Sequence, residues 1–209
     1  MVSTVLNVHY FFDPLCGWCF GASPLIDHLI QRDDIQLNLH PGGLFNSRTL
    51  SPETRQHFLE SDQKIHSMSG VEFGAAYQAK MRDADSVVLD SMLPIRAVLA
   101  AEQCGYAATE MLKRIQLAHY QQGKTVHEIE VLTSLAADIG IPADIWNDVF
   151  AQTDEQSDIA STTNLMLKQH LRGYPSMTVE IDGQWISVPV QSYFGNLKAW
   201  ETFWNQLSR

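Results

Sequence analysis

Residues 11–21 read Phe-Phe-Asp-Pro-Leu-Cys-Gly-Trp-Cys-Phe-Gly, so Cys16 and Cys19 form a C-x-x-C motif. Residues 4–12, which overlap the start of this stretch, are rich in β-branched and aromatic types, and we expect a strand that is buried on both faces. Apolar residues at helical spacing follow up to Asp33, with Pro24 expected to kink the helix that they predict. The two cysteines are therefore expected at the junction of a strand and a helix.

This position favours redox chemistry at the two cysteines. The N-terminus of a helix supplies partial positive charge and free N–H groups, which stabilise a thiolate at Cys16. Cys19 follows about one helical turn later, so its sulfur can attack a mixed disulfide formed on Cys16. The intervening Gly17-Trp18 contains no cation, and the nearest charge, Asp13, would oppose the thiolate if it pointed toward it. Asp13 is equally well explained as a polar turn residue.

The rest of the chain alternates between strand and helix signals. Alternation predicts a second strand from Ile35 to Leu39, and a helix is expected from Ser51-Pro52 to about Met68. The pattern stays helical to about residue 152, with capping boxes predicted at 125–128 and 153–156 and the last of these helices ending at Gly173. Residues 177–188 predict a hairpin that turns at Asp182-Gly183, and residues 197–207 a closing helix.

The order of elements predicts an α/β protein. It reads β-α-β, a helical block, and then α-β-β-α. We therefore expect one domain made of residues 1–45 and 156–209, with an inserted helical domain at 46–155.

Composition excludes several classes of function. The 209 residues include 14 basic and 24 acidic side chains, and the net charge of −10 disfavours nucleic acid and anionic membranes as partners. No apolar run is long enough for a membrane helix, and Met1–Tyr10 lacks the features of a secretory signal, so a cytoplasmic location is expected. A structural zinc site is disfavoured because no second pair of ligands accompanies the C-x-x-C, and we predict neither a metal nor a cofactor.

The 11–21 segment, the long helical block and the Arg-Gly-Tyr-Pro stretch at 172–175 ahead of a hairpin resemble the DsbA-like branch of the thioredoxin superfamily. More narrowly, they resemble the cytoplasmic FrnE-type proteins of that branch. The resemblance implies a thioredoxin fold with a large all-helical insertion, and thiol-disulfide exchange as the activity. It also implies that Cys16 attacks, that Cys19 resolves, and that Pro175 is a cis-proline facing the pair. Gly173, which is expected to end a helix directly before Tyr174-Pro175, agrees with a sharp change of direction there.

The expected partners are protein thiols or disulfides, with glutathione as a further candidate. Four residues are expected to bind substrate: Gly17, Trp18, Tyr174 and Pro175. Trp18 is expected to be exposed at the lip of the site, whereas Leu15 and Met177 either extend its apolar surface or pack in the core. Cys104 is expected to be structural, on the buried face of an insertion helix.

Two other functions remain open on the sequence. One is a thioredoxin-like adaptor that hands a client protein to a protease and would survive the loss of Cys16. The other is a glutathione-dependent isomerase of the hydroxychromene-carboxylate isomerase type, which typically has serine where Cys16 stands.

Overall fold

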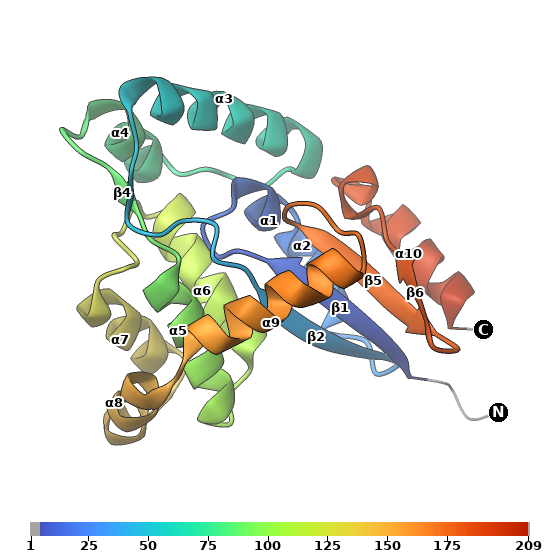
Figure 1. Ribbon diagram of the computed structural model, residues 1–209. Helices are drawn as coiled ribbons and strands as arrows, with labels where there is room; N and C mark the ends of the chain where they lie inside the picture. Colours follow the sequence, from blue (N-terminus) through green and yellow to red (C-terminus); the bar gives the residue numbers. More distant parts are fainter. Residues whose placement is uncertain (1–4, 209) are drawn as a thin grey trace.

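In the computed structural model, which describes residues 5–208, a four-stranded sheet lies at the centre of the chain (Figure 1). The strand order is β2 (Ile35–Pro41), β1 (Leu6–Phe12), β5 (Ser176–Ile181) and β6 (Gln184–Ser187). β1 runs parallel to β2 and antiparallel to β5, which pairs in turn with β6. The expectation that the first strand is central is confirmed, although Thr4, its predicted first residue, lies outside the described residues.

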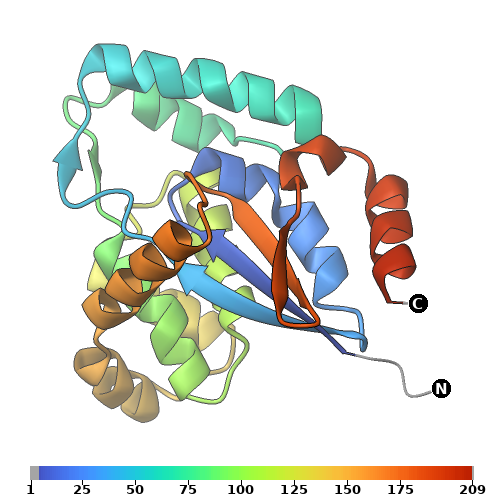
Figure 2. The same ribbon diagram turned by 45° about the vertical axis from the view of Figure 1, so that its right-hand side comes forward.

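Helices cover both faces of this sheet. One face carries α1 (Gly17–Gly21), α2 (Ser23–Leu29) and α10 (Leu197–Leu207), and the other carries α9 (Glu155–Lys168) (Figure 2). The helical segment is interrupted at Ala22, which separates α1 from α2. Pro24 lies in the first turn of α2, where its missing N–H costs no helical hydrogen bond. The predicted kink is therefore confirmed. A short 3₁₀ helix, η1 (Val190–Tyr193), leads from the hairpin toward α10.

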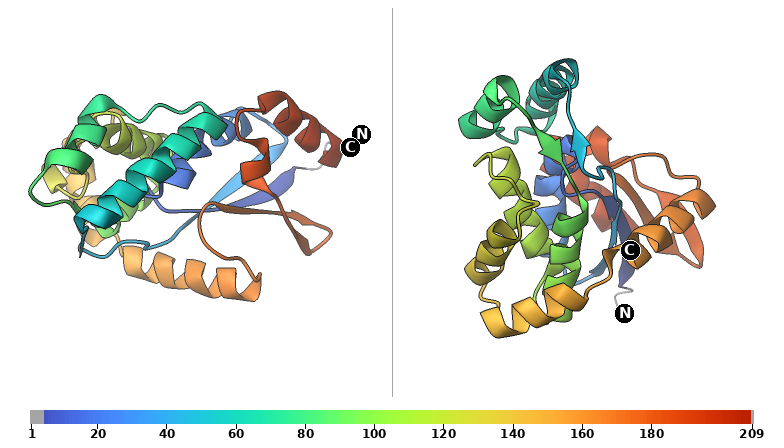
Figure 3. Two further views of the ribbon diagram at one scale, coloured as in Figure 1. Left: turned by 90° about the horizontal axis from the view of Figure 1, so that it is seen from above. Right: turned by 60° about the vertical axis from the view of Figure 1, so that its left-hand side comes forward.

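Between β2 and α9 the chain forms six helices that lie beside the sheet. They are α3 (Pro52–Ser69), α4 (Ala75–Asp83), α5 (Met92–Gln103), α6 (Ala108–Tyr120), α7 (Ile129–Asp138) and α8 (Ala143–Gln152). α3 and α6 both contact α1, and Figure 3 shows α3 lying above α1. A two-stranded sheet of β3 (Arg48–Thr49) and β4 (Val88–Leu89) was not predicted, because two residues are too few to show alternation.

The helix ends correct three predictions. The predicted capping box at residues 125–128 does not form, so that prediction is wrong. Helix α7 begins at Ile129, and the Thr125 hydroxyl instead accepts a hydrogen bond from Lys80 Nζ at 2.8 Å. The second box is displaced by one residue, because the carboxylate of Asp154 accepts the N–H groups of Gln156 and Ser157. α9 ends at Lys168 and not at Gly173, because the chain needs the intervening residues to turn toward β5.

The other boundaries agree with the sequence. The Ser51 side chain accepts the N–H of Thr54 and caps the start of α3, and Gly70, in the left-handed region, caps its end after Ser69. Asp182 and Gly183 have φ of 50° and 75°, as a type I′ hairpin turn requires. In the described part of the chain no helix is both long and apolar enough to cross a membrane.

One hydrophobic core joins the sheet to the helices on both sides. Its largest fully buried side chains come from β1, α2, α3, α6, α8 and α10, and include Trp146, Trp200, Trp204, Tyr10, Phe12, Ile65 and Met111. The α/β class with a helical insertion between two parts of one sheet is confirmed. The domain boundaries at 45/46 and 155/156 stay a prediction.

Candidate active site

Cys16 is the N-cap residue of α1, directly after the turn that follows β1. Its backbone is extended, with φ of −88° and ψ of 114°, and its carbonyl accepts the N–H groups of Cys19 and Phe20 at 2.9 and 3.0 Å. The residue is 7% exposed, and its sulfur faces a cavity between α1 and the inserted helices. The side chain that sequence reasoning placed at a helix start therefore lies there, with limited access to solvent.

Cys19 occupies a different environment. It is 1% exposed and packs in the core, where burial, followed by a hydrogen bond with Cys16, raises the pKa of its thiol well above the usual range. The two sulfurs are not bonded to each other in this structure. Cys19 is therefore a neutral thiol behind a cavity-facing Cys16.

The Tyr174–Pro175 bond is cis, as predicted, and brings the loop before β5 against the motif. The Cys16 thiol donates to the carbonyl oxygen of Tyr174 at 3.5 Å, which joins residues 158 positions apart. The Tyr174 ring packs over Gly42, where a Cβ would lie 1.9 Å from the phenol oxygen. Gly42 therefore makes room for the loop, and the Pro-Gly-Gly at 41–43 was the sequence signal for a close approach there.

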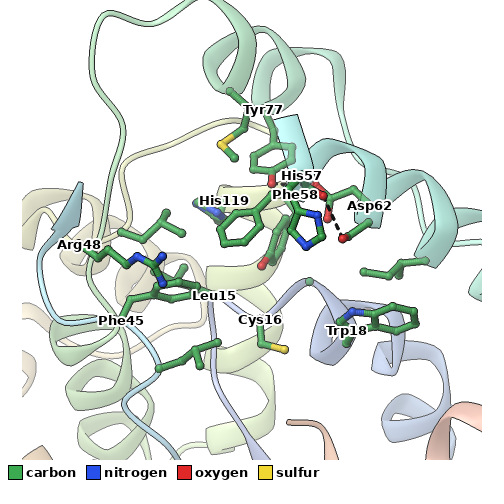
Figure 4. A pocket seen from close by; sticks show the side chains of 17 residues that line it. Leu15, Cys16, Trp18, Phe45, Arg48, His57, Phe58, Asp62, Tyr77 and His119 are labelled. Atoms are coloured by element: carbon green, nitrogen blue, oxygen red, sulfur yellow. Dashed lines mark hydrogen bonds between the residues drawn. The ribbon is translucent and has the colours of Figure 1, made fainter. Parts of the chain in front are cut away.

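The cavity in front of Cys16 has a volume of about 300 Å³ (Figure 4). Its apolar wall comes from the turn before α1, the segment after β2, α3, α4 and β4, and includes Leu15, Phe45, Phe58, Ile65, Met81 and Leu89. Its polar side chains are Arg48, His57, Ser61, Asp62, Tyr77, His119 and Tyr120. A largely apolar pocket with a few polar groups beside a thiol is suited to a small thiol compound or to a segment of polypeptide.

Asp62 and Tyr77 lie above Cys16 in this cavity, and sequence reasoning missed both (Figure 4). Asp62, on α3, is 6% exposed, and burial raises the pKa of its carboxyl to about 7. The Tyr77 hydroxyl donates to Asp62 Oδ2 at 2.9 Å. The sequence did contain a signal for Asp62. Asp62 lies three residues from both Leu59 and Ile65, and therefore on the same buried face of the helix as these two apolar residues.

Asp13 acts as a polar turn residue, as one of the two sequence interpretations expected, because its side chain accepts the N–H group two residues ahead. It is fully buried, and its Oδ1 accepts Leu15 N–H at 2.8 Å and Ser91 Oγ–H at 2.9 Å, while Oδ2 accepts Leu44 N–H at 2.7 Å. Burial raises the pKa of this carboxyl to about 7, although the three hydrogen bonds act in the opposite direction. Asp13 therefore ties the turn before Cys16 to the segment after β2 and to the start of α5.

The prediction that Trp18 is exposed is wrong, because it is partly buried against the ring of Phe194, with centroids 6.3 Å apart, while Lys64 Nζ lies 5.8 Å from its ring centroid. Phe194, directly after η1, and Lys64 on α3 therefore cover it. Leu15 and Met177 are buried, at 3% and 1% exposure, and Leu15 also lines the cavity. Cys104 is only partly buried, because it caps the C-terminus of α5 and does not lie on its buried face.

These features define a class of protein. A central strand leads into a C-x-x-C motif at a helix start, a cis-proline loop contacts the first cysteine, and helices cover both faces of the sheet. This is a thioredoxin fold that carries a dithiol site. The chain belongs to the family described as the DSBA-like thioredoxin domain, whose model matches residues 7–205. The predictions of a DsbA-like protein and of an oxidoreductase are confirmed.

Solved structures agree with this assignment. The cytosolic disulfide reductase DsbM from Pseudomonas aeruginosa is 32% identical, with a TM-score of 0.87 over 97% of this chain and 98% of that chain. A structure of DsbM with GSH matches at 30% identity and a TM-score of 0.85, with the same coverage. A 2-hydroxychromene-2-carboxylate isomerase matches at 13% identity, with a TM-score of 0.62 over 97% and 96% of the two chains, and shows the fold alone.

Proposed function

We propose that this protein is a thiol-disulfide oxidoreductase in which Cys16 attacks and Cys19 resolves. The observation that carries the proposal is the unequal placement of the two thiols. Cys16 faces the cavity at the start of a helix, whereas Cys19 is buried behind it with a raised pKa. A thiolate is the nucleophile in exchange, so the cavity-facing sulfur is the first attacker and the buried one reacts within the protein.

The exchange takes place in two steps. The Cys16 thiolate attacks a substrate disulfide, R–S–S–R′, forming Cys16–S–S–R and releasing R′–S⁻, which takes up a proton. Cys19 then loses its proton and attacks Cys16 Sγ, which forms the Cys16–Cys19 disulfide and releases R–S⁻. The substrate is reduced by two electrons and the protein is oxidised by two.

We further propose that glutathione returns the protein to its dithiol form. The DsbM structure with GSH supports this, and so does a cavity of about 300 Å³ that opens at Cys16. Three cationic or protonatable side chains near the cavity and its rim, Arg48, His57 and Lys64, are suited to the two carboxylates of glutathione. Two glutathione molecules reduce the disulfide and leave as one oxidised molecule. The 32% sequence identity to the cytosolic disulfide reductase DsbM supports a reducing role in the cytoplasm.

The proposed substrate surface consists of Gly17, Trp18, Tyr174 and Pro175, which surround Cys16 in sequence or in space. Trp18 contributes an apolar edge, and Tyr174 offers a carbonyl oxygen 3.5 Å from the sulfur. An isomerase of the hydroxychromene-carboxylate type is not supported by a specific observation, because position 16 carries a thiol that the exchange uses directly.

A trapping experiment tests the proposal. Cys19→Ala, made in a Cys104→Ser background, should accumulate mixed disulfides with client proteins, because nothing resolves the bond to Cys16. Cys16→Ala in the same background is the matched control and should trap little. Complexes are isolated from cells and compared with and without reductant. Partners that both variants bind equally, and that reductant does not release, would instead support the adaptor function.

A further inference from the structure

Asp62 lies in the wall between two cavities. On one side Asp62 lines the Cys16 cavity, and on the other it lines a second, more polar cavity of about 180 Å³ between α3 and α4 (the outer cavity). The second cavity is formed partly by exposed side chains, namely Gln63, His66, Glu72 and Arg82. The carboxyl thus connects the cavity of the reactive thiol with a polar surface that solvent reaches.

Asp62 also comes close to the C-x-x-C motif itself. A Cβ at Gly17 would lie only 2.9 Å from Asp62 Oδ1, so the absence of a side chain at position 17 is what allows this approach. The other oxygen, Oδ2, accepts the hydroxyl proton of Tyr77. Asp62 is therefore held by one hydrogen bond on α4, with its second oxygen directed toward the start of α1.

The groups around Asp62 leave its proton free to exchange. Within residues 5–208 no Lys, Arg or His forms an ion pair with it. Titratable and charged groups from several elements share the two cavities with Asp62. In the Cys16 cavity they are Cys16, Arg48, His57, Tyr77, His119 and Tyr120. In the outer cavity they are His66, Glu72 and Arg82. Burial lowers the pKa of His119 to about 3 and raises that of Tyr77 and of Tyr120, so these three stay uncharged at neutral pH.

We propose that Asp62 accepts the proton of an incoming small thiol in the cavity and passes it to solvent through the outer cavity. This inference rests on the proposed function and concerns its reductive half. In the step, Asp62–COO⁻ takes the proton of R–SH, and the thiolate attacks the outer sulfur of Cys16–S–S–R. The new R–S–S–R bond forms, the bond to Cys16 breaks, and Cys16 leaves as a thiolate. Asp62 then releases the proton to solvent.

The size of the effect follows from the ionisation of the attacking thiol. A thiol with an ordinary pKa near 8.5 is ionised to only about 3% at pH 7. A base that supplies the thiolate within the cavity therefore accelerates attack by up to about thirtyfold, which lies below the usual range for general base catalysis. A thiol that is already ionised at pH 7 gains nothing from the base. A substitution at Asp62 that removes proton transfer should therefore slow only the protonated thiol, whereas a structural disturbance should slow both kinds of thiol.

The test uses Cys19→Ala with Cys104→Ser, converted to the glutathione adduct of Cys16, so that a single exchange step is observed. Release of Cys16 is followed by mass spectrometry of the intact protein. Glutathione and thionitrobenzoate, an aromatic thiol that is ionised at neutral pH, serve as attackers. Asp62→Asn, which keeps the shape and can still accept from Tyr77, should slow glutathione by about three- to fifteenfold at pH 7, because only about half of the Asp62 carboxyls are ionised there. It should change the thionitrobenzoate rate by no more than about twofold.

Controls keep the experiment decisive. Glu60→Gln removes an exposed negative charge on α3 that lines neither cavity, and it should leave the ratio of the two rates unchanged. Asp62→Ser provides a smaller substitution if Asp62→Asn folds poorly, and it should show the same selective loss. Equal slowing of both thiols, or no slowing of either, would overturn the inference. The proposed function is tested separately, because trapping by Cys19→Ala does not depend on Asp62.

Discussion

At the residue scale, the cysteines are distinguished more by the helix end that each occupies than by exposure. Cys104, at the C-terminus of α5, is more exposed than Cys16, but carbonyl groups point toward that end and burial raises the pKa of its thiol. Cys16 lies at the opposite end of a helix, where N–H groups favour the anion. Exposure alone therefore does not identify the reactive cysteine, whereas the helix start favours Cys16.

We expect iodoacetamide to modify Cys16 much faster than Cys19 or Cys104 in the reduced protein at pH 7. Cys16 lies at a helix start and faces an open cavity, and both features favour reaction of its thiolate. Cys19 is buried in the core and Cys104 lies at a helix C-terminus, and the pKa of each thiol is raised. Timed alkylation followed by peptide mass spectrometry measures the three rates. Cys104→Ser should leave the rate at Cys16 unchanged. Equal rates at the three sites would contradict this assignment.

Gly17→Ala should disturb the site through Asp62. The new Cβ would lie 2.9 Å from Asp62 Oδ1 and 3.3 Å from Ile65 Cδ1, so these side chains, or α3 with them, have to shift away from α1. We expect a loss of about 1–3 kcal/mol in the free energy of unfolding, as in other overpacked sites. The same change in an Asp62→Ala background should cost less, because the nearest contact is gone. Urea unfolding of the four proteins measures the coupling, and identical costs in both backgrounds would rule out this contact as the cause.

At the scale of elements, Asp13 joins three segments at the base of the site. Its two oxygens accept three donors, from the turn before α1, the segment after β2 and the residue before α5. Sequence reasoning considered Asp13 only as a charge near Cys16 or as a polar turn residue, because the donors from Leu44 and Ser91 lie 31 and 78 residues away. Nothing in the local pattern indicates such distant partners.

Asp13→Asn should therefore destabilise the fold although it keeps the size of the side chain. Asparagine offers one acceptor oxygen and turns an amide N–H group toward a donor, leaving at least one buried donor unsatisfied. The expected loss is about 1–3 kcal/mol in the free energy of unfolding. Urea unfolding measures it, with an unchanged slope against denaturant indicating an unchanged native fold. Asp33→Asn, at an exposed aspartate, is the matched control and should change stability little.

At the scale of the whole molecule, stability depends on pH through several buried groups that act in opposite directions. Asp62 has a folded pKa of about 7, above its unfolded value, so its contribution is present below the unfolded pKa and is lost as pH rises through 7. His119 and His40, lowered by burial to about 3 and 4, contribute stability that is present above their unfolded pKa and lost in acid. The pH dependence of the stability of the intact protein is the sum of the contributions of these groups. The contribution of one group is therefore measured by comparing the protein with a variant that lacks it.

We expect Asp62→Asn to gain stability relative to the unmodified protein as pH rises from 5 to 8. The variant no longer has to ionise a buried carboxyl, while the histidine contributions are the same in both proteins and cancel. The relative gain should be on the order of 1 kcal/mol or more, since one pKa unit corresponds to about 1.4 kcal/mol. Urea midpoints at pH 5 and pH 8 provide the measurement. A difference that stays constant with pH would mean that Asp62 is not protonated in the folded state near neutrality.

The sequence alone determined the order of elements and the place of the two cysteines. Those features depend on local patterns: the apolar strand before Cys16, the helical spacing after Cys19, and the turn at Asp182-Gly183. The resemblance carried by the same residues pointed to the family and to the cis bond before Pro175. Only the tertiary structure brought Asp62 and Tyr77 over Cys16 and enclosed Asp13, because these hydrogen bonds join residues that are 15 to 78 positions apart. Burial, which sets the pKa of both carboxyls, is a property of the packed chain and has no local signature strong enough to predict it.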